Sequence, residues 1–202
     1  VVPPSCECIL KVPLQPVSHG PFDVTDLDGN MVLHVEPRPM PGRVAAATCA
    51  GNREPDESLA PPNCRLVLLT GFGNVLAQCG PAPGRATSPA QTDGPQNLAP
   101  ARASTEFHLL KGSGELFGKL TRTDAEEQQY TLTDRHGACL HFWGDIGTHI
   151  HVCGESRKLV ACTEIVPESM VDGRASCYKV QVAPLMDVGL ILCGLLCLDR
   201  LS

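Results

Sequence analysis

Two kinds of side chain are scarce in this sequence, the aromatic and the basic ones. Phe, Trp and Tyr make up 4% of the 202 residues. Lys and Arg number 16 against 22 Asp and Glu, which gives a formal net charge of −6. Such a chain lacks the excess of positive charge that attracts nucleic acids and anionic membranes without specificity. We therefore expect no nucleic acid among its partners.

Signals for export and the common catalytic motifs are also missing. The first residues, VVPPSCEC, lack the charged and apolar regions of a secretory signal. No GxSxG, HExxH or P-loop sequence occurs, and no CxxC pair suggests a zinc ribbon or a thioredoxin-like site. We therefore expect a protein that is not an enzyme and needs no cofactor. A thiol- or metal-dependent enzyme is the less favoured alternative.

Cysteine, by contrast, is abundant, and its number is odd, at 11. Most of the cysteines stand singly in apolar segments, where a free thiol behaves as a small apolar side chain. This use of cysteine is typical of a reducing compartment. We expect a cytoplasmic monomer, with a peripheral membrane location as the alternative.

The last segment of the chain is the one around which the rest is organised. Residues 188–198 contain no charged or strongly polar side chain. A helix that is apolar on every side must be buried on every side. The run is too short to cross a bilayer, which needs about 20 residues. We predict a core helix over about residues 185–200, with a short membrane anchor as the alternative.

Short strands and turns fill the remainder of the chain. The segment FDVTDLDGNMVLHVE alternates apolar and polar residues on both sides of Asp28-Gly29, which is a strong hairpin signal. Two Pro/Gly-rich segments, about 37–63 and 80–105, are predicted to be loop insertions. We predict strands near residues 6–12, 22–25, 31–35, 65–70, 75–79, 107–110, 116–121, 130–133, 138–143, 148–153, 158–165 and 176–182.

These elements together predict a barrel with a helix inside it. A helix with its side chains is about 10–12 Å across, and an eight-stranded barrel has room only for its own side chains. We therefore predict a mainly β (α+β) fold, a closed antiparallel barrel of about twelve strands around the C-terminal helix, as one domain over 1–202. Gly189 and Gly194 would stand where the wall comes closest to the helix.

Four motifs carry a resemblance to a known family. They are a strand–turn–strand unit of the form FxVxDxxGNxxxxV, an LLxxxGNxL unit, a strand beginning LF, and a YxVxVxPxxD strand followed by an apolar helix that ends in LDRL. Their residues are Phe22, Val24, Asp26, Gly29, Asn30 and Val35; Leu68, Leu69, Gly73, Asn74 and Leu76; Leu116, Phe117 and Arg122; and Tyr178, Val180, Val182, Pro184, Asp187 and Leu198 to Leu201. In these motifs the chain resembles the tubby C-terminal-like superfamily, most closely its LURP-one-related branch. The phospholipid scramblase branch is a more distant resemblance.

The resemblance implies a twelve-stranded barrel around a C-terminal helix, and an intracellular, non-enzymatic binding or scaffold module. The partner would be an unknown protein, or a membrane phosphoinositide as in the tubby branch. The acidic calcium-loop pattern of the scramblases is missing, because residues 176–186 contain no carboxylate. Calcium-triggered lipid movement is therefore not supported by any ligand set. A peripheral membrane phospholipid-binding or scramblase-like protein remains the alternative.

Phosphoinositide binding needs paired basic residues that converge on phosphates. The basic residues that form pairs on or beside predicted strands are Lys119 with Arg122 and Arg157 with Lys158, and these are the candidate lipid-binding residues. The competing interpretation is that they are solvated strand ends, and it is the favoured one. No catalytic residue is predicted.

His149, His151 and Cys153 alternate along one predicted strand and therefore project from the same face. Three nitrogen and sulfur ligands at this spacing could hold zinc or copper if a neighbouring strand gave a fourth. The favoured interpretation is the polar outer face of a barrel strand, with Ile150 and Val152 turned toward the core. We expect no metal.

Overall fold

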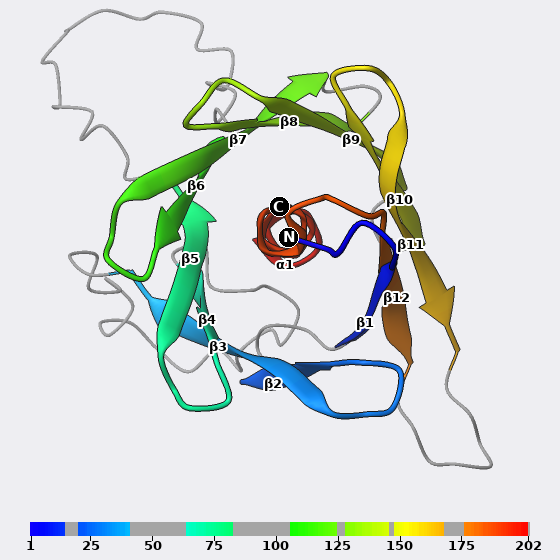
Figure 1. Ribbon diagram of the computed structural model, residues 1–202. Helices are drawn as coiled ribbons and strands as arrows, with labels where there is room; N and C mark the ends of the chain where they lie inside the picture. The colour runs from blue at the N-terminus through cyan, green and yellow to red at the C-terminus, as the bar shows by residue number, and fades with distance from the viewer. Residues whose placement is uncertain are drawn as a thin grey trace, which may run out of the picture.

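The computed structural model describes residues 1–14, 20–40, 64–82, 106–124, 128–145, 148–167 and 176–201. In this part of the chain, antiparallel strands form a closed barrel with one helix along its axis (Figure 1). The elements are β1 (Cys8–Pro13), β2 (Phe22–Thr25), β3 (Met31–Pro39), β4 (Cys64–Leu69), β5 (Val75–Pro81), β6 (Glu106–Lys111), β7 (Leu116–Asp124), β8 (Gln129–Asp134), β9 (Cys139–Asp145), β10 (His149–Gly154), β11 (Leu159–Val166), β12 (Cys177–Val182) and α1 (Val188–Leu201).

The wall follows the order of the sequence. Each strand pairs with the next one along the chain, and β1 closes the barrel by pairing with both β12 and β2. The β1–β12 ladder runs the full length of β1, whereas a single pair, Lys11 with Thr25, joins β1 to β2. The predicted fold class, a closed antiparallel barrel of twelve strands around a C-terminal helix, is confirmed.

Alternation along the strands produces the core. In β12, Tyr178, Val180 and Val182 are buried and pack in the main apolar cluster, while the residues between them are only partly buried. The same period of two runs through β9 and β10. Apolar side chains from the wall therefore meet the helix along most of the barrel.

The helix is enclosed by this layer through most of its length. Residues 191–198 are all buried, and apart from Gly194 each is at most 5% exposed. At Gly194, an added Cβ would lie 2.6 Å from Cζ of Phe142, which is itself buried in the wall. Glycine is favoured there because a side chain would have to displace the Phe142 ring. At Gly189 the expectation was wrong, because an added Cβ would meet only Asp187 Oδ1, at 3.3 Å.

One end of the barrel carries a set of tight hairpin turns, at residues 26–30, 70–74, 111–115, 134–138 and 154–158; we call it the turn end. In each turn the N–H of the fourth residue donates to the carbonyl of the first, at 2.8–3.3 Å. The fourth residue is Gly29, Gly73, Gly114, Gly137 or Arg157, and all have positive φ. Because neighbouring strands are antiparallel, the link from β12 to α1 also lies at the turn end.

Two predicted boundaries need correction. Pro37 to Pro39 were assigned to a loop, but they continue β3 and pair with Leu66, Arg65 and Cys64. Gly80 and Pro81 likewise continue β5. Both strands continue beyond the residues that alternate between apolar and polar. Proline is tolerated in them because it can occupy a strand where its missing N–H is not needed. The remaining parts of the loops predicted at 37–63 and 80–105 lie outside the described residues, apart from Met40 and Ala82.

Candidate binding cleft at the turn end of the barrel

At the turn end, the first residues of the chain cover one side of the helix. The N–H of Val2 donates to the carbonyl of Met186, and the N–H of Leu185 donates to the carbonyl of Val2, each at 2.9 Å. The Val2 side chain is 4% exposed and packs in the core. Figure 1 shows this segment crossing from the helix toward β1. The turn end of the barrel is therefore closed on the side of β1 and β12.

On the side of β5 to β8, the turn end is open. A cleft of about 460 Å³ separates the first turn of α1 from β5 to β8; we call it the turn-end cleft. Its apolar lining comes from Leu76, Ala77, Phe117 and Leu190, and its basic lining from Lys111 and Arg135. A smaller space of about 140 Å³ shares Phe117, Asp134 and Arg135 with it and extends to Lys119.

Close contact between the β4–β5 and β6–β7 hairpins positions Lys111 at the edge of the turn-end cleft. The N–H of Gly112 donates to the carbonyl of Leu76 at 2.9 Å. A Cβ at Gly112 would overlap the carbonyl oxygen of Val75. Only glycine lets the turn after β6 lie against the start of β5 in this way. Lys111, which precedes this glycine, is thereby held beside the apolar residues of β5.

Lys111 and Arg135 share one carboxylate. Lys111 Nζ lies 2.7 Å from Glu115 Oε2, and Arg135 Nη1 lies 3.1 Å from Glu115 Oε1. The Lys111 ammonium, and then the Arg135 guanidinium, hold the pKa of the Glu115 carboxyl below its usual value. The field at this edge of the cleft therefore stabilises a negative charge.

Three further polar groups line the cleft, and each already has a partner. Arg135 Nε donates to His136 Nε2 at 2.9 Å. Asp134 Oδ1 accepts from the N–H groups of His136 and Ala138, at 2.7 and 2.9 Å. Asp187 Oδ1 caps the helix by accepting from the N–H of Leu190 at 3.0 Å.

The structure does not bring the candidate lipid-binding residues together. Lys119 lies in the smaller space beside the cleft, 3.6 Å from Glu106 Oε1. Arg122 stands near the opposite end of β7, with its guanidinium 5.9 Å from the centre of the Tyr130 ring. Arg157 and Lys158 are exposed in the turn between β10 and β11. The four cations are thus divided among three places.

His149, His151 and Cys153 face outward, as expected, while Ile150 and Val152 are buried. His151 stacks at a tilt on Trp143, with ring centres 4.5 Å apart. No three potential metal ligands in the described part of the chain are close enough to hold an ion. The predicted alternation is confirmed, and these side chains belong to the outer wall.

A second hollow of about 460 Å³ runs along this wall. It is lined by His141, Trp143, Cys153 and Arg157 among others. His141 stands opposite Cys153 in the ladder, and Thr131 Oγ1 lies 3.1 Å from His141 Nδ1. Sequence reasoning did not find this arrangement, because it depends on the register of three strands.

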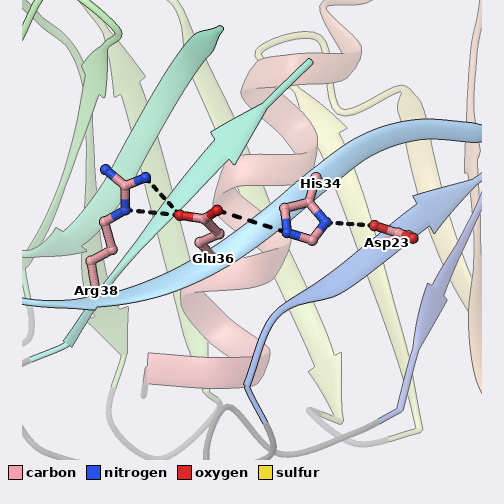
Figure 2. Close-up of polar contacts among 4 residues, drawn as sticks. All are labelled: Asp23, His34, Glu36 and Arg38. Carbon is pink, nitrogen blue, oxygen red and sulfur yellow. Dashed lines mark hydrogen bonds and ion pairs between the residues drawn. The ribbon is translucent and has the colours of Figure 1, made fainter. Parts of the chain in front are cut away.

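Another polar cluster follows the outer face of β2 and β3 (Figure 2). His34 Nδ1 lies 2.6 Å from Asp23 Oδ1, and His34 Nε2 lies 3.9 Å from Glu36 Oε1. Arg38 Nη2 lies 2.6 Å from Glu36 Oε2. Both nitrogens of His34 face carboxylates, so the ring is not aimed at a nucleophile. The alternating spacing of positions 34, 36 and 38 in a strand was the available signal for this cluster.

The cysteines are free in the described part of the chain. Cys193 is completely buried in the helix, where its hydrogen bond with Cys79 and the loss of solvent raise the pKa of its thiol well above the usual value. A protonated, enclosed thiol is a poor nucleophile. These two cysteines therefore serve as small core side chains.

The fold has a known counterpart among solved structures. No protein-family model matches the chain, and no curated protein matches it in sequence. An X-ray structure of a protein from Arabidopsis thaliana, AT5G01750, superposes with a TM-score of 0.56 at 17% sequence identity. The match covers 98% of this chain and 92% of that one. The twelve-stranded barrel fits a tubby-like fold. At this level of identity the likeness concerns the fold alone.

Proposed function

We propose that this protein is a non-enzymatic binding or scaffold module of the tubby C-terminal-like superfamily, in its LURP-one-related branch. It acts as a cytoplasmic monomer and recognises another protein. The observation that carries the proposal is the filled interior: α1 occupies the barrel axis, and residues 191–198 are buried on all sides. A ligand must therefore be recognised on the surface, where the turn-end cleft combines an apolar lining with charged groups.

The motif resemblance and the similarity of the barrel to the Arabidopsis structure support the family assignment. The active-site alternative would need a nucleophile with a base aimed at it. In the described residues, both ring nitrogens of His34 face carboxylates, and the core thiols of Cys79 and Cys193 are shielded. A binding role therefore fits the side chains of the molecule better than catalysis does.

Lipid binding is the second candidate, because part of the basic set lies near the turn-end cleft. The division of these cations argues against tight phosphoinositide binding, because a multivalent headgroup needs several of them at one point. No helix in the described ranges is both long and apolar enough to cross a membrane. A lipid-binding role would therefore rest on surface contacts of the barrel.

Sedimentation with liposomes separates the two candidates. Neutral phosphatidylcholine vesicles, with and without phosphoinositide, are mixed with the protein at low and at high salt. We expect the protein to stay in the supernatant in every case. Sedimentation that requires phosphoinositide and is lost at high salt would replace the scaffold proposal by the lipid-binding one. Stoichiometric metal in the purified protein would instead favour the metal-enzyme alternative.

A further inference from the structure

We propose that the turn-end cleft binds a partner protein through a peptide carboxylate that stands next to large apolar side chains. This inference rests on the proposed binding function and gives the chemistry of the partner. The acidic group would contact Lys111 and Arg135, and the apolar groups would fill the space between the wall and the first turn of the helix.

Replaceable ion pairs provide the first argument. Glu115 is the carboxylate that Lys111 and Arg135 share, and its side chain is 53% exposed. Exposed ion pairs contribute little to stability, so Glu115 can return to water at small cost. A ligand carboxylate could then take its place, and the planar guanidinium of Arg135 suits a carboxylate with two oxygens.

Exposed apolar surface beside these cations is the second argument. Leu76 is 49% exposed although it lines the cleft, and Phe117 and Leu190 are partly buried. Leu116, at the adjoining smaller space, is also exposed. A volume of about 460 Å³ can take only a few side chains. The cleft therefore fits a short segment of a partner chain.

The local charge balance disfavours a ligand with several negative charges. Two cations, Lys111 and Arg135, face three carboxylates, those of Glu115, Asp134 and Asp187. Asp134 and Asp187 already accept backbone N–H groups, which keeps them in place. A multiply charged phosphate would be repelled by these two groups, whereas one carboxylate can pair with the cations. The balance thus favours an acidic peptide over a phosphorylated headgroup.

Amide NMR of the isotopically labelled 1–202 chain tests this proposal with three synthetic peptides. The first is acetyl-Gly-Asp-Leu-Phe-Gly-amide, and the other two replace its Asp by Asn or by Lys. We expect the Asp peptide to shift the amide resonances of Ala77, Arg135, Gly189 and Leu190. The dissociation constant obtained from these shifts should be about 1 mM. The Asn and Lys peptides should bind at least about tenfold more weakly, because they lack the charge that the cations recognise.

Variants with opposite expected effects sharpen the test. Arg135→Gln and Lys111→Gln should each weaken binding of the Asp peptide by about threefold to fivefold, because each removes one of the two exposed cations. Glu115→Gln should strengthen it several-fold, because it removes the competing carboxylate. Arg38→Gln, which removes an ion pair on the outer wall, is the matched control and should leave binding unchanged.

Several results would overturn the inference. Among the peptides, these results are equal binding of the Asp and Asn peptides or preference for the Lys peptide. In the spectra, they are shifts confined to residues outside the cleft, or no shift at a peptide concentration of about 10 mM. Among the variants, it is a Glu115→Gln protein that binds the Asp peptide no better than the unchanged protein does. Each of these would remove the cleft assignment while leaving the binding-module proposal to the liposome test. Phosphoinositide-dependent sedimentation would remove the proposed function itself.

Discussion

The two parts of the C-terminal helix differ more from each other than the uniform apolar sequence suggests. Residues 191–198 are all buried by the wall, whereas Gly189 is exposed and Leu190 is only partly covered. Residues 191–198 stabilise the barrel, whereas Gly189 and Leu190 line the turn-end cleft. One helix thus fills the barrel along its body, and its start lines the cleft that we propose for recognition.

The barrel wall shows the same division between its two faces. Val24 is fully buried on the inner face of β2, whereas the neighbouring Asp23 is half exposed on the outer face. Ion pairs along the outer face are solvent-exposed and worth about 0–1 kcal/mol each. Substitutions inside the barrel should therefore have large effects on stability, and those on the outside should have small ones.

Leu192→Asp should have the largest effect of the single substitutions. Leu192 is 1% exposed, so the new carboxyl would be buried among apolar side chains at a cost of several kcal/mol, whether ionised or neutral. This cost approaches the total stability of a typical domain, about 5–15 kcal/mol. We expect insoluble or unfolded protein, as measured by soluble yield and circular dichroism. Leu185→Asp, at an exposed leucine just before the helix, is the control and should fold normally.

Substitution of each helix glycine by alanine compares the two parts of the helix directly. Gly194→Ala gains about 1 kcal/mol of helix propensity, but its methyl group collides with Phe142 at a cost of about 1–3 kcal/mol. We expect a net loss of about 1 kcal/mol in urea unfolding. Gly189→Ala meets no wall atom and should be neutral or stabilising. An identical response of the two glycines would mean that the wall does not close on Gly194.

Arg157→Gly should stabilise the protein modestly. Arg157 has a φ of 56° at the turn position where the other hairpins have glycine. A side chain in this left-handed conformation costs about 1–2 kcal/mol, and the added flexibility of glycine in the unfolded chain cancels about 0.5–1 kcal/mol of the gain. The expected gain is about 0.5–1 kcal/mol in thermal unfolding. The reciprocal change, Gly137→Ala, should destabilise, and the same sign for both changes would contradict this explanation.

The smallest effect is expected for the outer face of β10. Changing His149, His151 and Cys153 together to Ser should alter the free energy of unfolding by less than about 1 kcal/mol. Changing the inward Ile150 and Val152 to Ser should cost well over about 2 kcal/mol, because both are buried. A loss above about 2 kcal/mol in the outer triple variant would indicate a structural metal or a buried face.

The strands, the helix and the inward or outward direction of β10 could be predicted from local periodicity, because apolar and polar residues alternate with the strand pitch. The turns at Gly29 and Gly73 were also visible, since glycine accepts the positive φ that they need. The start and end of a strand were less visible where proline continues it, as in Pro37 to Pro39.

The turn-end cleft could not be predicted in this way. Lys111, Arg135 and Leu190 are far apart in the sequence and meet only because the barrel closes in a particular register. Each taken alone reads as an ordinary hairpin or helix residue. The basic residues chosen from the sequence were placed correctly on strands and turns, but their spacing along the chain did not indicate that they would point to different parts of the surface.

The central claim is that the wall folds around the C-terminal helix, and thermal unfolding of a chain that ends at Pro184 tests it most directly. Without α1, the inward side chains of the strands would surround an empty space, so the barrel should not form. The account predicts an insoluble product, or a soluble one with no cooperative transition by circular dichroism. A truncated chain that stays monomeric and melts cooperatively, with a midpoint close to that of the 1–202 chain, would contradict it.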